Sequence, residues 1–285
     1  MLDLPVEALK QFARGIRNGW LWTRFLIDRK LFKNEAVRFR CNICGKQTIA
    51  PLRLVTQREA PSCSSCFSNR RFRAIIAALS RELFDEIVPL SEMVHCNPIV
   101  GVGLSDANIY ARPLSKKFSY ENTYYHKKPR LDITSPGKEM FETADFVIAS
   151  DIFEHICPPI DQAFDKLFKI MKKGGFCVFS VPYNDEGETV EHYPELFEFE
   201  IVRRGGKKVL INTTRDGKKQ AFKNLKFHGG HGATLEMRIF SKSSLIEGFK
   251  KAGFADIRVH DDCIPEIGVL FDDNEPSQII TFRKP

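Results

Sequence analysis

The chain has 285 residues, 43% of them hydrophobic and 28% charged, and its formal net charge is +7. This length and composition predict a globular protein with a full hydrophobic core, in one large domain or a domain with an appendage. No apolar run is long enough to cross a bilayer and no signal peptide is present, so the sequence predicts neither a membrane-spanning nor a secreted protein. The positive charge favours anionic partners without naming one.

Residues 1–38 form a predicted helical segment. Leu9, Phe12 and Trp20 fall on one helical face, and Gly15 weakens the middle of the helix. The simpler interpretation is a helix packed on the body of the protein. The alternative is peripheral contact with a membrane surface, through the aromatic and basic residues that follow.

Two Cys-x2-Cys pairs occupy the next segment, residues 39–90. Cys41 and Cys44 are separated by 18 residues from Cys63 and Cys66. Each pair places two thiolates on one tight turn, and two such turns complete a closed, structural zinc site. Unpaired core cysteines and an iron–sulfur site are the alternatives, and this symmetric spacing favours them less. The other four cysteines are scattered, as in reduced cytosol, so we predict a cytoplasmic protein.

The most informative stretch is 145–183, which reads DFVIASDIFEHICPPIDQAFDKLFKIMKKGGFCVFSVPY. It predicts a buried strand ending near Asp151, a helix capped by Gly174, and a second strand that stops just before Tyr183. In an open α/β sheet such units are parallel and bind ligands beyond the carboxyl ends of the strands. We therefore expect Asp151, His155 and Tyr183 at a ligand-binding edge.

The pieces DFVIASDIFEHI, MKKGG and FCVFSVPY resemble the fourth strand, the following helix and the fifth strand of class I S-adenosylmethionine-dependent methyltransferases, of the type 11-like kind. The resemblance implies a Rossmann-like, doubly wound sheet in three α/β/α layers over residues 91–285, with S-adenosylmethionine as cofactor. The segment SCSSCFSNRRFRAIIAALSRELF resembles the zinc module that precedes the methyltransferase domain in some members. In many members the EH pair is architectural, and its histidine braces the start of the helix.

The resemblance places the first strand and the glycine loop in PIVGVGLSDANIY, residues 98–110. Gly101 and Gly103 would let the backbone approach the cofactor, although the third glycine of GxGxG is absent. Ser105 follows in the loop, and Ser105 or Asp106 is expected to cap the next helix. On this alignment, Gly103→Leu should abolish binding of S-adenosylhomocysteine while the protein stays folded. Another alignment makes GVGLSD the second strand.

Residues 118–134, FSYENTYYHKKPRLDIT, are then expected to hold the second and third strands. The resemblance places Asn122 near the cofactor's ribose. It also makes Asp132 the acceptor for the adenine amino group. The alternative is that both residues are turn formers beside Pro129.

An insertion over residues 184–240 is predicted to be rich in β structure. Two hairpin signals, Gly205-Gly206 and Asp216-Gly217, flank the strand VLIN. The insertion carries a basic run: Arg203, Arg204, Lys207, Lys208, Arg215, Lys218, Lys219, Lys223 and Lys226. These charges protect strand edges, or they bind phosphate or nucleic acid; we favour the first because no aromatic residues for base stacking interleave with them.

The predicted function is transfer of a methyl group from S-adenosylmethionine to a sugar, glycan or small-molecule hydroxyl. Asp151 is expected beside the methyl group, and the candidate bases, in order, are His155, His192 and His228. His192, His228 and His231 are expected to line the mouth of the acceptor site. The alternatives are an RNA methyltransferase and a catalytically inactive, methyltransferase-like zinc-binding protein.

Overall fold

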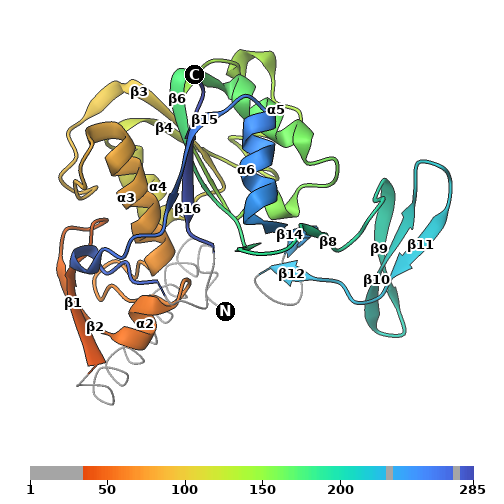
Figure 1. The fold of residues 1–285 in the computed structure, drawn as a ribbon, viewed down its shortest axis with the longest axis horizontal. Helices are drawn as coiled ribbons and strands as arrows, with labels where there is room; N and C mark the ends of the chain where they lie inside the picture. The colour runs from red at the N-terminus through yellow and green to blue at the C-terminus, as the bar shows by residue number, and fades with distance from the viewer. Residues whose placement is uncertain (1–34, 229–233, 272–276) are drawn as a thin grey trace, which may run out of the picture. The chain divides into compact units, whose positions relative to one another are not determined.

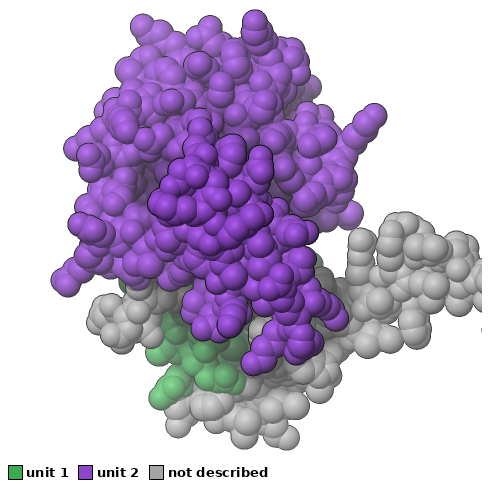
Figure 2. Space-filling model, turned by 90° about the vertical axis from the view of Figure 1, so that its right-hand side faces the viewer, with its two compact units in different colours: residues 1–94, 261–274 green, residues 95–260, 275–285 purple. Residues whose placement is uncertain are grey.

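The computed structural model of the protein describes residues 35–228, 234–271 and 277–285. Almost all of the predicted N-terminal helical segment, with its membrane contact, lies outside the described residues, as does His231. The chain divides into two compact units, the first comprising residues 1–94 and 261–274 and the second residues 95–260 and 275–285 (Figure 2). Segment 261–274, which the sequence assigned to the methyltransferase domain, is thus part of the unit that holds the cysteine pairs.

The first unit is built on a hairpin and one long helix. Strands β1 (Ala36–Arg40) and β2 (Gln47–Pro51) are antiparallel, and helices α2 (Leu52–Thr56) and α3 (Arg70–Phe84) follow, with a 3-10 turn η4 (Pro265–Ile267) from the later segment. Helix α3 begins after Asn69, whose side chain accepts a hydrogen bond from the backbone N–H of Phe72 at 2.8 Å. It ends at Asp85, which has a left-handed conformation.

The second unit contains a six-stranded sheet of order β15-β16-β6-β5-β3-β4 (Figure 1). Its strands are β3 (Cys96–Leu104), β4 (Phe118–Thr123), β5 (Ala144–Ser150), β6 (Met171–Ser180), β15 (Ala255–His260) and β16 (Ile279–Arg283). The first four are parallel, and β16 is antiparallel to both of its neighbours. This arrangement confirms the predicted parallel strand–helix–strand unit, and β16 and β15 add an antiparallel end to the sheet.

Helices cover both faces of this sheet. On one face α5 (Asp161–Ile170) and α6 (Lys242–Lys251) bury a core in which the ring centroid of Phe249 lies 5.3 Å from that of Phe164 and 5.2 Å from that of Phe179. On the other face lies α4 (Asn108–Leu114). The predicted three-layer, Rossmann-like fold is confirmed. Within the described residues, no helix combines the length and apolarity that crossing a bilayer requires.

Strand β3 occupies the centre of the parallel sheet, where it pairs with β4 on one side and β5 on the other. GVGLSD is therefore the first strand, and the alignment that made it the second strand is wrong. The prediction of a third strand is also wrong. Residues 124–143 form one isolated bridge, Tyr124 with Arg130, and a 3-10 turn, Lys138–Met140, but no strand.

Two local predictions need correction because tertiary contacts replace helix caps. Helix α5 ends at Ile170, so Gly174 is not its cap; with a φ of 77°, Gly174 lies inside β6 where the register with β5 shifts. Helix α4 has Ala107 at its N-cap and no side-chain cap, because the Asp106 carboxylate binds the hydroxyl of Tyr110 at 2.7 Å instead.

The insertion forms the predicted β-meander, a separate sheet of order β11-β10-β9 (Figure 1). Its strands are β9 (Glu198–Arg204), β10 (Lys207–Thr213) and β11 (Lys219–Phe222). Gly205 and Gly206 both have positive φ, as a two-residue hairpin turn requires. Short strands flank this sheet in the chain. Between β6 and β9 lie β7 (Tyr183–Asn184) and β8 (Val190–Glu191), and between β11 and α6 lie β12 (Phe227–His228), β13 (Thr234–Leu235) and β14 (Arg238–Ser241).

Candidate functional site

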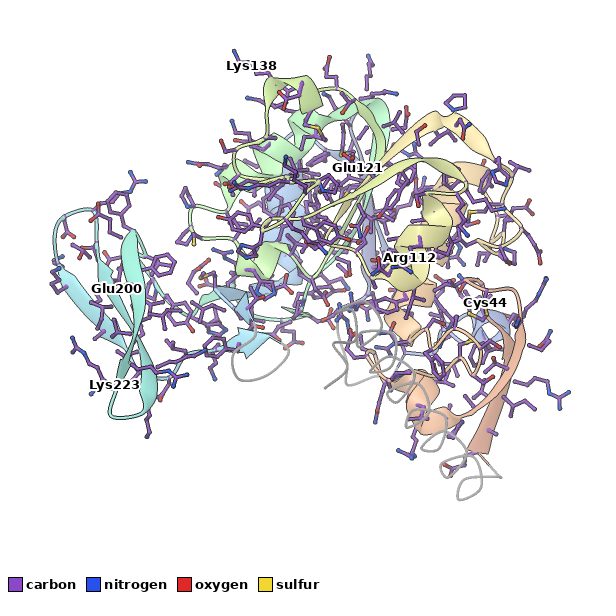
Figure 3. The ribbon with its side chains drawn as sticks, turned by 180° about the vertical axis from the view of Figure 1, so that it is seen from behind. Cys44, Arg112, Glu121, Lys138, Glu200 and Lys223 are labelled. Carbon is purple, nitrogen blue, oxygen red and sulfur yellow. The ribbon has the colours of Figure 1, made fainter. Side chains whose placement is uncertain are left out.

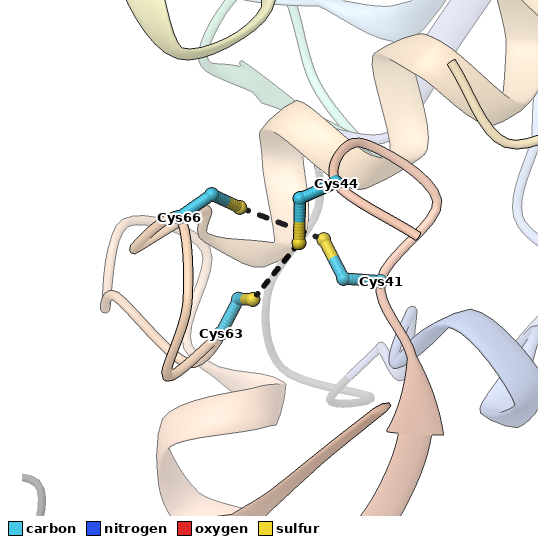
Figure 4. A group of neighbouring side chains, drawn as sticks. All are labelled: Cys41, Cys44, Cys63 and Cys66. Carbon is cyan, nitrogen blue, oxygen red and sulfur yellow. Dashed lines mark hydrogen bonds between the residues drawn. The ribbon is translucent and has the colours of Figure 1, made fainter. Parts of the chain in front are cut away.

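The four predicted metal-binding cysteines converge in the first unit (Figure 4). The Sγ atoms of Cys41 and Cys66 are 3.7 Å apart, those of Cys44 and Cys63 are 3.8 Å apart, and all four lie within 4.8 Å of one another. A tetrahedral zinc ion bound at about 2.3 Å by four sulfurs holds them roughly 3.8 Å apart. A disulfide would need about 2.05 Å. The cluster therefore fits a metal ion, and all eight cysteines are free of disulfides.

The two Cys-x2-Cys turns have the same backbone design. The N–H of Gly45 donates to the carbonyl of Cys41 at 2.8 Å, and the N–H of Phe67 donates to the carbonyl of Cys63 at 3.0 Å. Both donors have left-handed conformations, with φ of 73° and 58°. Glycine takes this conformation easily at the first turn, whereas the phenylalanine at the second adopts it against its preference. The backbone is thus arranged for two matched metal-binding turns.

A buried arginine, which the sequence analysis did not identify as part of this centre, lies beside the cysteines. Arg73 donates to the carbonyl of Ser68 at 2.8 Å, the hydroxyl of Ser62 at 2.9 Å and the carbonyl of Gly268 at 2.7 Å. Burial lowers the pKa of Arg73 to about 10, opposed by the charges of the cysteines, so the guanidinium remains charged at neutral pH. A zinc ion with four thiolates would carry two net negative charges, which this cation would complement.

In the second unit, the carboxyl ends of the parallel strands meet at one edge of the sheet. Gly103 of β3 is in register with Asn122 of β4 and Ile148 of β5. At the end of β5, Asp151 adopts a left-handed conformation, with φ of 54°, and its N–H donates to the carbonyl of Ser180 at 2.8 Å. This is the edge at which open α/β sheets bind ligands.

The two glycines of β3 make room for neighbouring side chains. A Cβ atom on Gly101 would meet the ring of Phe146, and one on Gly103 would meet the hydroxyl of Tyr120 and the carboxylate of Asp106. Internal packing therefore accounts for both glycines without a cofactor. The expectation that Gly103→Leu leaves the protein folded needs correction, because that side chain would displace Tyr120 and Asp106.

Asn122 fixes the loop that follows β3. Its side-chain oxygen accepts from the N–H of Asp106 at 2.8 Å, and its amide donates to the carbonyl of Asp106 at 2.9 Å and to the hydroxyl of Tyr124 at 3.1 Å. Burial, together with the nearby Asp106 carboxylate, raises the pKa of Tyr120 well above its usual value, so that hydroxyl stays protonated and donates to Asp106. Ser105, the first residue after β3, is exposed.

Asp132 forms a turn just beyond the end of β4. Its Oδ1 accepts from the N–H of Thr134 at 3.0 Å and from the hydroxyl of Thr134 at 2.7 Å. The N–H of Leu131 donates to the carbonyl of Tyr124 at 3.0 Å, which holds this turn next to the strand end. The structure thus gives Asp132 the turn-forming role that the sequence left open, at the ligand edge of the sheet.

The EH pair lies in the 3-10 turn η3 (Phe153–His155). Nδ1 of His155 donates to the carbonyl of Leu235 at 2.9 Å, since a carbonyl can only accept, and the N–H of Met237 donates to the carbonyl of Glu154 at 2.7 Å. Both contacts join η3 to the segment that returns from the insertion. His155 therefore braces the turn, as the EH histidine does in many members of the family that the sequence resembles.

Arg238 holds the same turn, and the sequence analysis missed it. Its side chain is fully buried; Nη1 donates to the carbonyls of Phe153 at 3.0 Å and Ile156 at 2.7 Å, and Nε donates to Glu191 Oε1 at 2.6 Å. The signal lay in LEMRIF, where a charged residue stands among apolar residues. A lone arginine next to apolar residues gave no means of predicting its partners.

His192 is paired with a carboxylate that the sequence analysis also missed. Its Nε2 lies 2.9 Å from Oε1 of Glu236, and both side chains are largely buried, with exposed fractions of 12% and 16%. The N–H of His192 donates to the carbonyl of Met237 at 2.8 Å. Segment 235–238 thus contacts both His155 and His192. The third candidate, His228, has its backbone in β12 and a side chain outside the description.

A family model described as "Methyltransferase domain" matches residues 81–259 of the chain, more than half of its length. The chain belongs to this methyltransferase family. The sequence-based identification of an S-adenosylmethionine-dependent methyltransferase is thereby confirmed, whereas the acceptor and the roles of the site residues stay open. No curated protein matches the chain.

Solved structures with a similar fold include a 1,6-didemethyltoxoflavin-N1-methyltransferase from Burkholderia thailandensis with S-adenosylhomocysteine bound. It is 12% identical, covers 99% of this chain and 93% of its own, and has a TM-score of 0.41. An S-adenosylmethionine-dependent methyltransferase described as putative, from Listeria monocytogenes, is 13% identical. The match covers 73% of this chain and 99% of the Listeria chain, with a TM-score of 0.41. A glycopeptide N-methyltransferase, MtfA, is 9% identical, with coverages of 66% and 87% and a TM-score of 0.38.

Proposed function

We propose that this protein methylates a hydroxyl group of a sugar, a glycan or another small molecule, and that His192 is the base. The observation that supports this choice is the 2.9 Å pair between His192 Nε2 and Glu236 Oε1. A carboxylate that accepts from one imidazole nitrogen fixes the tautomer and leaves the other nitrogen basic. His155 is less suited to be the base because it donates to a backbone carbonyl and braces η3.

S-adenosylmethionine, when bound, supplies an electrophilic methyl group on a sulfonium. In the proposed site, Asp132 would accept from the adenine amino group, Ser105 and Asn122 would bind towards the ribose, and Asp151 would hold the cofactor at the methyl end. Nδ1 of His192 takes the proton of the acceptor hydroxyl, so that the oxygen attacks as it becomes negative. Glu236 then stabilises the imidazolium, and alignment of the acceptor supplies much of the remaining rate.

We further propose that Cys41, Cys44, Cys63 and Cys66 bind one structural zinc ion. The sulfur spacing supports this assignment, and four protein ligands leave no position for an activated water. The absence of disulfides among the eight cysteines supports a reducing compartment, and we propose the cytoplasm.

The test uses purified protein, labelled S-adenosylmethionine, and fractionated small metabolites, glycans and RNA. We expect label in the small-molecule or glycan fraction, and Glu236→Gln and His192→Gln should each reduce transfer by about 10² to 10⁴. Binding of S-adenosylhomocysteine, measured by calorimetry, should be unchanged in both variants. Glu236→Gln should also shift the pH dependence of transfer, because the glutamine no longer stabilises the imidazolium.

Two results would contradict the proposal. Label that appears only in RNA would favour the RNA methyltransferase alternative. Wild-type protein that binds neither S-adenosylmethionine nor S-adenosylhomocysteine would favour the inactive, zinc-binding alternative.

A further inference from the structure

A concave basic surface lies on the insertion sheet, at the end that carries the β9–β10 hairpin turn. Its volume is about 650 Å³. Five cations line it from two segments of chain, and no acidic residue does: Arg203, Lys207, Lys208, Lys223 and Lys226. Figure 3 shows Lys223 at this end of the sheet. We call these five side chains and the space between them the basic pocket.

The hairpin places like charges directly opposite each other. In the antiparallel register, Arg203 faces Lys208 and Arg204 faces Lys207. Like charges in such cross-strand pairs are destabilising. The fold therefore holds four cations at one hairpin end, and three of them, Arg203, Lys207 and Lys208, line the pocket, where a bound anion would relieve part of the repulsion.

No described acid forms an ion pair with any of the five cations of the basic pocket. The same sheet does contain a neutralised lysine elsewhere: Lys218, in the turn between β10 and β11, lies 2.8 Å from the carboxylate of Asp216. The charge of the basic pocket is thus uncompensated within the described chain, whereas that of the other turn is partly balanced.

The wall that contributes Lys226 is held rigidly. The backbone N–H of Lys226 donates to the hydroxyl of Tyr193 at 2.6 Å, and the carbonyl of Lys226 accepts from the N–H of Glu236 at 2.9 Å. Tyr193 is itself buried in the small core beneath this sheet. These two hydrogen bonds therefore fix the backbone of Lys226 on this side of the pocket.

Apolar side chains line the pocket between the charges. Leu225 and Phe227 contribute to its surface, and Nζ of Lys208 lies 4.9 Å from the centroid of the Phe227 ring. The sequence argument that aromatic residues do not interleave with the basic run therefore needs correction, since folding brings Phe227 next to Lys208. Clustered ammonium and guanidinium groups beside an apolar ring suit a ligand that joins phosphates to a ring system.

We propose that the basic pocket binds a small ligand with two linked phosphate groups, of the size of a nucleoside diphosphate. The volume lies within the range of small-molecule sites, and lysines bind phosphate oxygens as point charges. A phosphodiester strand presents the same chemistry, but a concavity with a single aromatic ring, Phe227, offers no row of stacking residues for successive bases and so favours a small ligand over a strand. None of the residues that line the pocket is assigned to the proposed methyl-transfer site, although the backbone of Lys226 contacts that of Glu236, and ligand binding is measured without methyl transfer.

The chain offers two matched double variants. Lys207→Ser with Lys208→Ser removes two cations from the basic pocket, and Lys218→Ser with Lys219→Ser removes two cations from the same sheet outside it. Binding of pyrophosphate, of uridine diphosphate and of a twelve-nucleotide single-stranded RNA is measured by calorimetry at fixed salt. Saturating S-adenosylhomocysteine is present throughout, so that no probe is counted at the methyl-transfer site.

We expect pyrophosphate and uridine diphosphate to bind the wild type, with uridine diphosphate the tighter because its base reaches Phe227. The pocket variant should weaken both by about tenfold or more, and the control variant by less than about twofold, as expected for the loss of direct charge-assisted contacts. Equal weakening by the two variants would show general charge attraction and overturn the proposal. Failure of the wild type to bind either small probe, or binding of the RNA alone, would also overturn it.

Discussion

Gly103 shows how the role of a residue depends on what surrounds it. The sequence suggests a glycine of a cofactor loop. In the fold, Gly103 lies on β3 against the side chains of Tyr120, on β4, and Asp106, just after β3. Tyr110 and Tyr120 both donate to the Asp106 carboxylate, and Asn122 binds both backbone polar groups of Asp106. A compact network therefore holds the loop in place, and the glycine is part of that network.

Gly103→Ala tests this role. The added methyl group must displace the hydroxyl of Tyr120 or the carboxylate of Asp106, so we expect a loss of about 1–3 kcal/mol in the free energy of unfolding. Urea denaturation measures it. Tyr120→Phe in the same chain should restore part of the loss, because it removes the nearest atom, and a double-mutant cycle gives the coupling. Additive effects of the two substitutions would contradict the packing explanation.

Arg238 allows a second prediction at the residue scale. Replacing it with methionine leaves the carbonyls of Phe153 and Ile156 without their donor, so stability should fall by about 2–4 kcal/mol. Methyl transfer should fall as well, because the η3 turn loses its position. Arg238→Lys keeps the charge and not the forked donors, and should recover only part of both losses. Denaturation and transfer assays measure the two effects, and full recovery by lysine would show that charge alone matters.

At the scale of elements, the sequence predicted what depends on local pattern. The turn signals Gly205-Gly206 and Asp216-Gly217 predicted the hairpins of the insertion on either side of the strand VLIN. Contacts between distant segments were not predictable in this way. The Arg73 bond to the carbonyl of Gly268 and the His192 pair with Glu236 join residues 195 and 44 positions apart.

The missing third strand has the same origin. The composition of residues 124–134 predicts a strand and a turn. In the structure, Tyr124 forms a single bridge with Arg130, and the Asp132 turn follows. The caps predicted at Asp106 and Gly174 failed because each residue has a tertiary role that local propensity does not contain. The zinc spacing, in contrast, is local enough to be predicted from two short turns.

The insertion sheet depends on one buried amide. Asn212, fully buried on β10, accepts from the N–H of Phe197 at 2.9 Å and donates to the carbonyl of Glu195 at 3.0 Å and to Gln220 at 2.7 Å. Asn212→Ala leaves these groups unsatisfied and should destabilise the sheet by about 1–3 kcal/mol. Hydrogen exchange should show faster exchange in β9–β11 and unchanged protection in β5 and β6.

Asn212→Asp is a second variant for this prediction. It preserves the acceptor for Phe197 but places a buried carboxylate against two oxygen acceptors, so exchange in β9–β11 should be at least as fast as in Asn212→Ala. Equal acceleration in β5 and β6 would show that the insertion and the six-stranded sheet unfold as one, contrary to the expectation.

At the scale of the whole molecule, the cysteine cluster and the proposed methyl-transfer site belong to different compact units. The cysteine cluster and the residues that support it, including Gly268, belong to residues 1–94 and 261–274. The strand ends, the His192–Glu236 pair and the insertion belong to residues 95–260 and 275–285. Loss of the metal should therefore damage the first unit before it affects ligand binding by the second.

Zinc removal tests this separation. We expect about one zinc ion per chain by metal analysis, because four thiolates at tetrahedral spacing form a closed site. Cys63→Ser should lose the ion and lower the stability of the first unit by roughly 3 kcal/mol or more, since binding of a structural zinc is coupled to folding. Calorimetry should still detect S-adenosylhomocysteine binding at temperatures where the second unit remains folded. Cys263→Ser is the control, because Cys263 lies in the same unit and outside the cluster. Purified protein without zinc, or equal destabilisation by both substitutions, would contradict a structural metal centre at these four cysteines.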